Sequence, residues 1–312
     1  MPAYTNKTWI PLQAGDVVDI VAPASASTPQ ELRQGVAYLK SLGLVPRVPK
    51  DLYDKRFVFS NSDQYRLKHL LKSLLSPDSR AVWAIRGGYG SMRLLPMLAK
   101  ARAPKQTKLL LGLSDITSLH IFLNQEWNWP TVHGPVLARM GGDHPKRLER
   151  SEVERVLFGR VDELSYRLTP KNKYARSHGR IRSSLTGGNL EVIAGQQGTP
   201  WQIEARSKIL FIEEVNERGY RVDRKFQNFK LSGVFDEASA VVFGEFVGGT
   251  EPDTGRKMWK DAIDELAATV KIPVYTGLRS GHGHVQRPVP FNTEARLEGR
   301  VLTVKTGAKI RP

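Results

Sequence analysis

The sequence predicts an α/β protein: an N-terminal domain with a mainly parallel sheet and flanking helices, then a C-terminal mixed α/β domain rich in short strands. Three observations lead to this prediction. Strand-like and helix-like segments alternate through the first half of the chain, whereas the second half has fewer clean helices and shorter strands. A polar, basic, turn-rich stretch near residues 160–183 separates the halves. A length of 312 residues is sufficient for two domains.

In the first half, apolar runs predict buried strands, and apolar residues at helical spacing predict the helices between them. Thr28-Pro29 provides a helix N-cap with proline at the first helical position. The predicted strands are 17–22, 44–48, 82–85, 109–111 and 132–134, and the predicted helices are 29–42, 64–75, 91–99 and 117–124. Such an alternation gives parallel strands, and ligands then bind at the carboxyl ends of those strands.

In the second half, the predicted strands are 209–213, 240–243, 274–276, 295–297 and 301–304, and the predicted helices are 220–231 and 259–268. We therefore divide the chain into an N-terminal α/β domain (1–160), a linker (161–183) and a C-terminal domain (184–312). The cluster of basic residues between 171 and 182 is interpreted first as part of a solvated linker and second as a binding patch.

The composition restricts the possible functions. The chain has no cysteine, which excludes disulfides, thiol nucleophiles and cysteine-ligated zinc. Its net charge of +16 favours acidic partners, but the positive residues are spread along the sequence. No zinc finger or aromatic RNA-binding motif is present, so we expect no nucleic-acid partner and keep nucleic-acid binding as a minor alternative.

No apolar run approaches the roughly 18 residues of a membrane span. The N-terminal segment also lacks the apolar core of a signal peptide. We therefore expect a cytoplasmic protein, with the periplasm as the location if a leader segment was removed.

The segment Gly112-Leu113-Ser114-Asp115-Ile116 lies where a buried strand turns into a helix. A serine at a helix N-terminus has backbone N–H groups and the helix dipole beside it, and both favour negative charge. Acyl transfer needs such an exposed hydroxyl with nearby donors for an oxyanion. An ordinary helix N-cap has the same pattern. Ile116 replaces the last glycine of the α/β-hydrolase elbow, which disfavours that fold.

A glycine-rich turn, Arg86-Gly87-Gly88-Tyr89-Gly90, follows the strand 82–85. Its glycines allow the backbone to approach a ligand closely and to present free N–H groups. The same glycine pattern also suits a tight strand-to-helix turn or a phosphate-binding loop, although neither of the common phosphate-loop motifs is matched.

A carboxylate and a histidine also follow strand-like runs in the second half. Glu213 and Glu214 are adjacent at a strand end, and neighbouring strand residues point to opposite faces, so both cannot face one site. His282 and His284 lie in a turn after another strand. Either could act as a general base, and together they could bind a metal, but no companion ligand motif accompanies them.

Serine, glutamate and histidine thus each follow a strand, in that order along the chain. A hydroxyl nucleophile needs a base to accept its proton and an acid to orient that base. Because Ser114 falls in the first domain and Glu213 and His282 fall in the second, we expect the site at the domain interface.

These segments together resemble the serine LD-carboxypeptidase family, which includes murein tetrapeptide carboxypeptidases and microcin C self-immunity hydrolases. The resemblance covers nearly the whole chain in order. The matching stretches are Gly15–Val17, Val21–Ser25, Arg86–Gly90, Gly112–Thr117, His133–Pro135, Thr186–Leu190, Leu210–Glu214, Tyr220–Arg224 and Gly281-His282.

The resemblance implies that Ser114 is the nucleophile, His282 the base and Glu213 its orienting acid. It implies an oxyanion hole built from the N–H groups of Asp115 and of Gly87 or Gly88. It also implies a metal-independent, commonly dimeric enzyme without a cofactor. Two departures are notable: Ser280 precedes the Gly-His pair where the family more often has phenylalanine, and His284 is an additional histidine.

The implied substrate is a peptidoglycan tetrapeptide, cleaved between the L-centre of a diamino acid and the terminal D-alanine. Such a site must bind a free carboxylate, which the fork of an arginine suits. The candidates by position for substrate binding are Arg86, Tyr89, His133, Arg221 and Arg224. Two alternatives remain: a microcin C-type hydrolase of aminoacyl nucleotides, and a non-enzymatic nucleotide-binding module.

Overall fold

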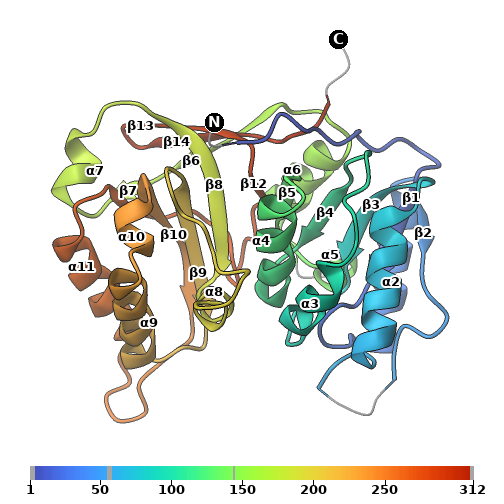
Figure 1. Ribbon diagram of the computed structural model, residues 1–312, viewed down its shortest axis with the longest axis horizontal. Coiled ribbons are helices and arrows are strands. Elements are labelled where there is room, and N and C mark those ends of the chain that lie inside the picture. The colour runs from blue at the N-terminus through green and yellow to red at the C-terminus, as the bar shows by residue number, and fades with distance from the viewer. Residues whose placement is uncertain (1–3, 55–57, 143–144, 310–312) are drawn as a thin grey trace.

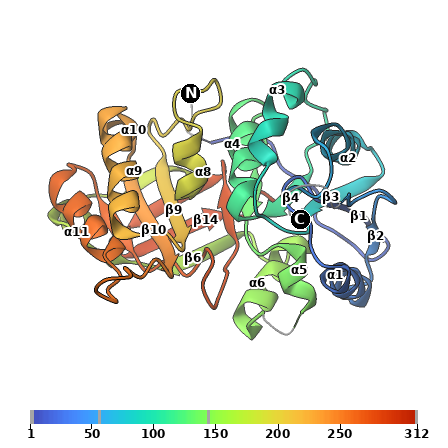
Figure 2. The same ribbon diagram turned by 90° about the horizontal axis from the view of Figure 1, so that it is seen from below.

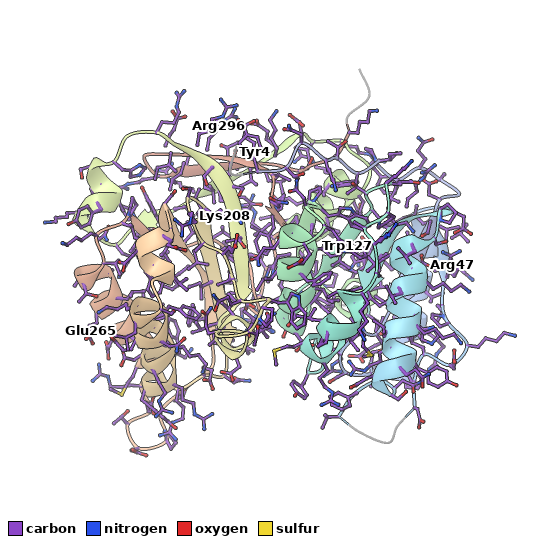
Figure 3. The ribbon with its side chains drawn as sticks, in the orientation of Figure 1. Tyr4, Arg47, Trp127, Lys208, Glu265 and Arg296 are labelled. Carbon is purple, nitrogen blue, oxygen red and sulfur yellow. The ribbon has the colours of Figure 1, made fainter. Side chains whose placement is uncertain are left out.

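The computed structural model describes residues 4–54, 58–142 and 145–309. The chain forms two lobes, each built on one β-sheet, and they meet along strand β8 (Ile181–Asn189) and helix α4 (Thr117–Gln125) (Figure 1). Figure 3 labels Arg47 and Glu265, which lie at the opposite outer edges of the two lobes. The predicted fold class is confirmed.

The first sheet has six strands within the described ranges, in the order β12-β5-β4-β3-β1-β2. Strands β1 to β5 run parallel, and β12 is antiparallel to β5. Their bounds are β1 (Val17–Val21), β2 (Val45–Arg47), β3 (Ser79–Ala84), β4 (Leu109–Gly112), β5 (Thr131–His133) and β12 (Val289–Phe291). Because β12 comes late in the chain, the edge strand of the first sheet is supplied by residues that follow most of the second lobe in the sequence.

Helices cover both faces of this sheet, with α1, α5 and α6 on one side and α2, α3 and α4 on the other (Figure 2). Helix α1 starts with a capping box, in which Thr28 Oγ1 accepts from the Glu31 N–H at 3.1 Å and Glu31 accepts from the Thr28 N–H at 2.7 Å. The remaining bounds are α1 (Pro29–Ser41), α2 (Asp63–Leu75), η1 (Ser91–Leu94), α3 (Leu95–Leu98), η2 (Ser114–Ile116), α5 (Leu137–Gly141) and α6 (Arg147–Leu157).

The second sheet has eight strands in the part of the chain described here, in the order β6-β14-β13-β8-β9-β10-β11-β7. Strands β8 to β11 are parallel, and the others are antiparallel to their neighbours. Their bounds are β6 (Glu163–Arg167), β7 (Thr169–Pro170), β9 (Ile209–Val215), β10 (Ala240–Val247), β11 (Val274–Thr276), β13 (Glu294–Glu298) and β14 (Val301–Lys305). The helices are α7 (Lys173–Ser177), α8 (Leu190–Gly195), α9 (Gly219–Leu231), α10 (Val234–Glu237) and α11 (Trp259–Thr269).

Residues 161–183, which the sequence suggests as a linker, contain β6, β7 and α7. Strand β6 pairs with β14, and β7 pairs with β11. The physical reason lies in the pattern Glu163–Arg167, where Leu164 and Tyr166 are buried between more exposed neighbours, as in a strand with one solvated face. These residues therefore form both edges of the second sheet.

No helix within the described ranges combines the length and the apolar character that a bilayer crossing requires.

A buried cluster of rings joins the two lobes. His133 on β5 and Phe291 on β12 belong to the first sheet, whereas Phe211 on β9 belongs to the second. The ring centroids of His133 and Phe211 are 5.2 Å apart, and those of Phe211 and Phe291 are 6.1 Å apart. All three side chains are fully buried. The burial of large aromatic rings supplies much of the free energy that holds two packed layers together.

We predict that Phe211→Ala lowers the free energy of unfolding by roughly 3–5 kcal/mol, because it removes a fully buried ring and leaves a cavity between the lobes. Leu231→Ala, at the 89% exposed end of α9, is the matched control and should change stability by about 0.5 kcal/mol or less. Urea unfolding followed by circular dichroism measures both. Equal midpoints for the two variants would contradict this account of the junction.

Candidate active site

Ser114 lies on the sharp turn between β4 and η2, as the sequence predicts. Its φ angle of 66° is in the left-handed region, which is costly for a residue with a side chain. The turn is held by the next residue, since the buried Asp115 carboxylate accepts a hydrogen bond from the Ser91 N–H at 2.7 Å. The strained backbone directs the Ser114 side chain into a cavity at the carboxyl end of the first sheet.

The glycine-rich turn lies directly against this serine. A Cβ atom on Gly87 would be 2.8 Å from the Ser114 Cβ, so only glycine permits the approach. Gly88 has φ of 106°, another conformation that suits glycine. Ser25 fixes the turn by donating its N–H to the Gly87 carbonyl at 3.1 Å and accepting from the Tyr89 N–H at 3.2 Å.

Two backbone donors of this turn, and one beside the serine, are free for a ligand. In the described part of the chain, the N–H groups of Gly87, Gly88 and Asp115 donate to no protein acceptor. Two of these residues line the Ser114 cavity, and the third follows the serine directly. Free N–H groups beside a hydroxyl are the arrangement that an oxyanion hole requires.

His282 is hydrogen-bonded to Glu213, with 2.7 Å between Nδ1 and Oε2. Glu213 is fully buried near the carboxyl end of β9, and its Oε1 atom has no hydrogen-bond partner within the described residues. Gly281 has φ of 119°, and a Cβ atom there would lie 2.8 Å from Glu213 Oε2. Glycine therefore allows the carboxylate to pass beneath the chain and reach the imidazole.

The carboxylate controls the charge of the ring. Burial alone disfavours the imidazolium, but the negative charge and hydrogen bond of Glu213 outweigh it and raise the pKa of His282 above its ordinary value. The Nδ1 atom is committed to Glu213, so Nε2 is the ring nitrogen left to exchange protons with a ligand.

Ser114 and His282 line one cavity of about 690 Å³ together with Gly87, Gly88 and Arg86. No hydrogen bond joins their side chains, although both lie within the described residues. Catalytic hydrogen bonds in enzymes without substrate are often long and shorten when the substrate binds. The cavity thus brings together a strained hydroxyl, free N–H donors and a carboxylate-paired imidazole.

Glu214 faces away from this cavity, as the alternation along a strand requires. Its oxygens accept from the Asn189 side chain at 3.1 Å and from the Glu191 N–H at 2.8 Å. Burial raises its pKa to about 7, against the opposing effect of its hydrogen bonds. Its contacts join β9 to the start of α8, which is a structural role.

Several other predicted residues do not line the Ser114 cavity. His133 is fully buried, packs on the ring cluster and has a strongly lowered pKa because burial disfavours its charge. Arg221 and Arg224 lie on α9 around the exposed Tyr220 ring. His284 lines a neighbouring cavity instead.

Two predicted residues lie at the glycine-rich turn itself. Arg86 lines the cavity but is half exposed, with Nη1 3.7 Å from Glu31 Oε2. Tyr89 is 49% exposed, and its ring packs on Phe59 at 5.5 Å rather than entering the cavity.

The sequence analysis did not identify Arg139 and Gln286, which also line this cavity. Both depend on Glu149, a fully buried carboxylate on α6. Glu149 accepts from Arg139 Nε at 2.7 Å, from Arg139 Nη2 at 3.0 Å and from the Gln286 N–H at 3.0 Å. Arg139 also donates to the His284 carbonyl at 2.8 Å. The first lobe thereby fixes residues 279–287, which we name the histidine loop.

A second carboxylate of α6 fixes the end of the histidine loop. Glu152 is buried and accepts from Arg287 Nε at 2.7 Å and from Arg287 Nη2 at 2.5 Å. Arg287 also donates to the Ser165 carbonyl at 2.9 Å and lies over the Tyr166 ring. Charge-assisted hydrogen bonds of this kind are stronger than neutral ones. No local sequence pattern indicates them, since the partners are more than 100 residues apart.

Among the described residues, no group of three or more histidine, cysteine, aspartate or glutamate side chains is arranged to hold a metal ion.

Residues 18–134 match the LD-carboxypeptidase N-terminal domain, and residues 182–297 match the LD-carboxypeptidase C-terminal domain. A relative from Rickettsia conorii that carries a carboxypeptidase name is 33% identical over 90% of this chain and 87% of its own. The murein tetrapeptide carboxypeptidase of Pseudomonas aeruginosa is 29% identical over 96% of this chain and 97% of its own.

Solved structures agree with the fold. The muramoyltetrapeptide carboxypeptidase of Oxalobacter formigenes superimposes with a TM-score of 0.77 at 26% identity, covering 93% of this chain and 98% of that one. The microcin C7 self-immunity protein superimposes with a TM-score of 0.81 at 21% identity, covering 96% and 98%, and shares the fold. The chain belongs to the serine LD-carboxypeptidase family.

We predict that Glu213→Gln lowers the pKa of His282, because the amide removes the negative charge that favours the imidazolium. The sign for stability follows: the raised pKa contributes stability that is complete below the ordinary histidine pKa and is lost as the pH rises through the raised value. NMR titration of the His282 ring in both proteins measures the shift. An unchanged pKa in the variant would contradict the assigned pairing.

We predict that Glu149→Gln increases amide hydrogen exchange in the histidine loop roughly tenfold, because the loop loses a charged acceptor. Glu154→Gln on the same helix is the matched control, since Glu154 contacts Tyr38 and not the loop. Exchange measured by mass spectrometry should then be unchanged at residues 279–287. Equal exchange in both variants would argue against this anchoring.

Proposed function

We propose that the chain is a metal-independent serine LD-carboxypeptidase that releases terminal D-alanine from murein tetrapeptides. One observation carries the proposal: the Glu213–His282 pair and the strained Ser114 face the same cavity beside free backbone donors. The names of the Pseudomonas and Oxalobacter relatives support the substrate, because both refer to the tetrapeptide of the cell wall.

In the proposed reaction, His282 Nε2 removes the proton from Ser114 Oγ as the oxygen attacks the carbonyl carbon of the LD amide. The N–H groups of Asp115 and of Gly87 or Gly88 stabilise the negative oxygen of the tetrahedral intermediate. His282 then gives the proton to the departing D-alanine nitrogen, and the C–N bond breaks to leave an acyl ester on Ser114.

Water completes the cycle. His282 takes a proton from the water, the resulting hydroxide attacks the ester, and Ser114 Oγ recovers the proton from His282 as the acid is released. Glu213 accepts from Nδ1–H throughout and remains ionised, which orients the ring and stabilises the imidazolium. Because the base must be neutral to act, the raised pKa of His282 sets the lower pH limit of activity.

A microcin C-type self-immunity hydrolase is the second candidate, since the Escherichia coli self-immunity protein is 25% identical over 92% of both chains. Nucleotide bases commonly stack on the ring of an aromatic side chain. Of the described residues that line the Ser114 cavity, none is Phe, Tyr or Trp, which favours the peptide. Parallel assays on a tetrapeptide and an aminoacyl sulfamoyl nucleotide separate the candidates.

We further propose that the protein is a cytoplasmic homodimer that needs no cofactor and binds no nucleic acid. Removal of a leader segment would instead place it in the periplasm. The numerous carboxylates of peptidoglycan peptides suit the net charge of +16.

We predict that Ser114→Ala reduces D-alanine release from the tetrapeptide by roughly 10⁴-fold or more, because it removes the nucleophile. Mass spectrometry of the peptide follows the loss of the residue. Ser177→Ala, an exposed serine on α7, is the control and should retain full activity, as should the wild type in EDTA. Activity retained in Ser114→Ala would overturn the assigned nucleophile, and loss in EDTA would overturn metal independence.

A further inference from the structure

A second cavity of about 460 Å³ adjoins the Ser114 cavity and shares two of its lining residues, His282 and Arg139. It extends past Gly283 toward Lys146, which precedes α6, and Lys257, which precedes α11. None of the residues predicted from the sequence to bind a carboxylate lines it. The His282 side chain is therefore shared by the two cavities.

The proposed reaction indicates which part of the substrate lies in each cavity. Ser114, Gly87 and Gly88 line only the first cavity, so the attacked carbonyl carbon and its oxygen must lie there. The departing nitrogen must lie beside the group that protonates it, which is His282 in the proposed function. The residue attached to that nitrogen therefore extends past the imidazole, toward the second cavity.

The second cavity carries mainly positive charge. Its lining includes three cationic side chains, Arg139, Lys146 and Lys257, and one carboxyl group, that of Glu245. Glu245 lies against Gly283, where a Cβ would be 1.9 Å from its Oε2, and burial raises its pKa above the ordinary value. Three cationic side chains around one space favour an anionic group of the substrate.

Arg139 is the best positioned of the three. Glu149 holds its Nε and Nη2 atoms, so the side chain is fixed before a substrate arrives. Its Nη1 atom donates to no protein group in the described part of the chain, and the side chain is partly exposed where the two cavities meet. A fixed guanidinium with a free edge is suited to bind a carboxylate.

We propose that the second cavity is the leaving-group subsite and that Arg139, assisted by Lys146 and Lys257 at its rim, binds the C-terminal carboxylate of the departing residue. The subsite rests on the proposed function and explains exopeptidase specificity. A peptide without a free carboxylate at that position lacks the group that Arg139 binds, whereas the reacting atoms are unaffected.

The test is a cycle of enzyme variants and two substrates, the tetrapeptide and the same peptide with a C-terminal carboxamide. For the wild type, kcat/KM should fall about tenfold or more on the carboxamide, the loss typical of a hydrogen bond to a charged group. For Arg139→Gln, kcat/KM should fall below the wild-type value by a similar factor on the tetrapeptide acid and by about twofold or less on the carboxamide. Arg139→Lys should recover part of the loss on the acid.

Because Arg139 also fixes the histidine loop, rim variants provide an independent readout. Lys257→Met should lower kcat/KM on the acid by about two- to fivefold and leave the carboxamide unchanged. Lys260→Met is the matched control, since Lys260 lies over the Trp259 ring outside the cavity, and it should change neither.

The outcomes separate the two proposals. Equal losses on both substrates in Arg139→Gln, together with no effect of Lys257→Met, overturn the subsite and leave Arg139 with a positioning role only. Equal rates of the wild type on both substrates overturn it as well. A wild type that cleaves neither peptide overturns the proposed function, and the subsite that rests on it.

Discussion

The site depends on a constraint at the junction of the lobes, because the proposed nucleophile and the carboxylate that orients the proposed base come from different sheets. Ser114 follows β4 of the first sheet, whereas Glu213 lies near the carboxyl end of β9 in the second. Three features fix their relative position: the pairing of β12 with β5, the ring cluster around Phe211, and the carboxylates of α6 that hold the histidine loop. The geometry needed for proton transfer is therefore a property of the junction as a whole.

Local strain adds to this constraint. The positive φ angle of Ser114 and the close approach of Gly87 place the hydroxyl beside the free N–H groups before any ligand is present. Donors that are already oriented need no reorganisation during the reaction, which is why such sites stabilise an oxyanion strongly. The cost of the strained turn is offset by buried contacts such as that of Asp115 with the Ser91 N–H.

Much of the fold and the site could be predicted from local patterns. Strand alternation predicted that Glu213 and Glu214 cannot both face one site, the family resemblance selected Glu213, and the structure places only Glu213 against an imidazole. The sequence could not reveal that His133 is enclosed by aromatic rings, nor that residues 161–183 complete a sheet, since both depend on distant partners. The same reason applies to Arg139 and Glu149, because their contacts with the histidine loop form only when that loop packs against the first lobe.

The central claim is that Ser114 is activated by His282 in one cavity. Reaction with a fluorophosphonate, followed by peptide mapping with mass spectrometry, tests it most directly, because the reagent captures a serine only when a base and an oxyanion hole assist the attack. The account predicts a single adduct on Ser114 whose formation is slowed by several orders of magnitude in His282→Ala. An adduct on another serine, or equal labelling rates with and without His282, would contradict it.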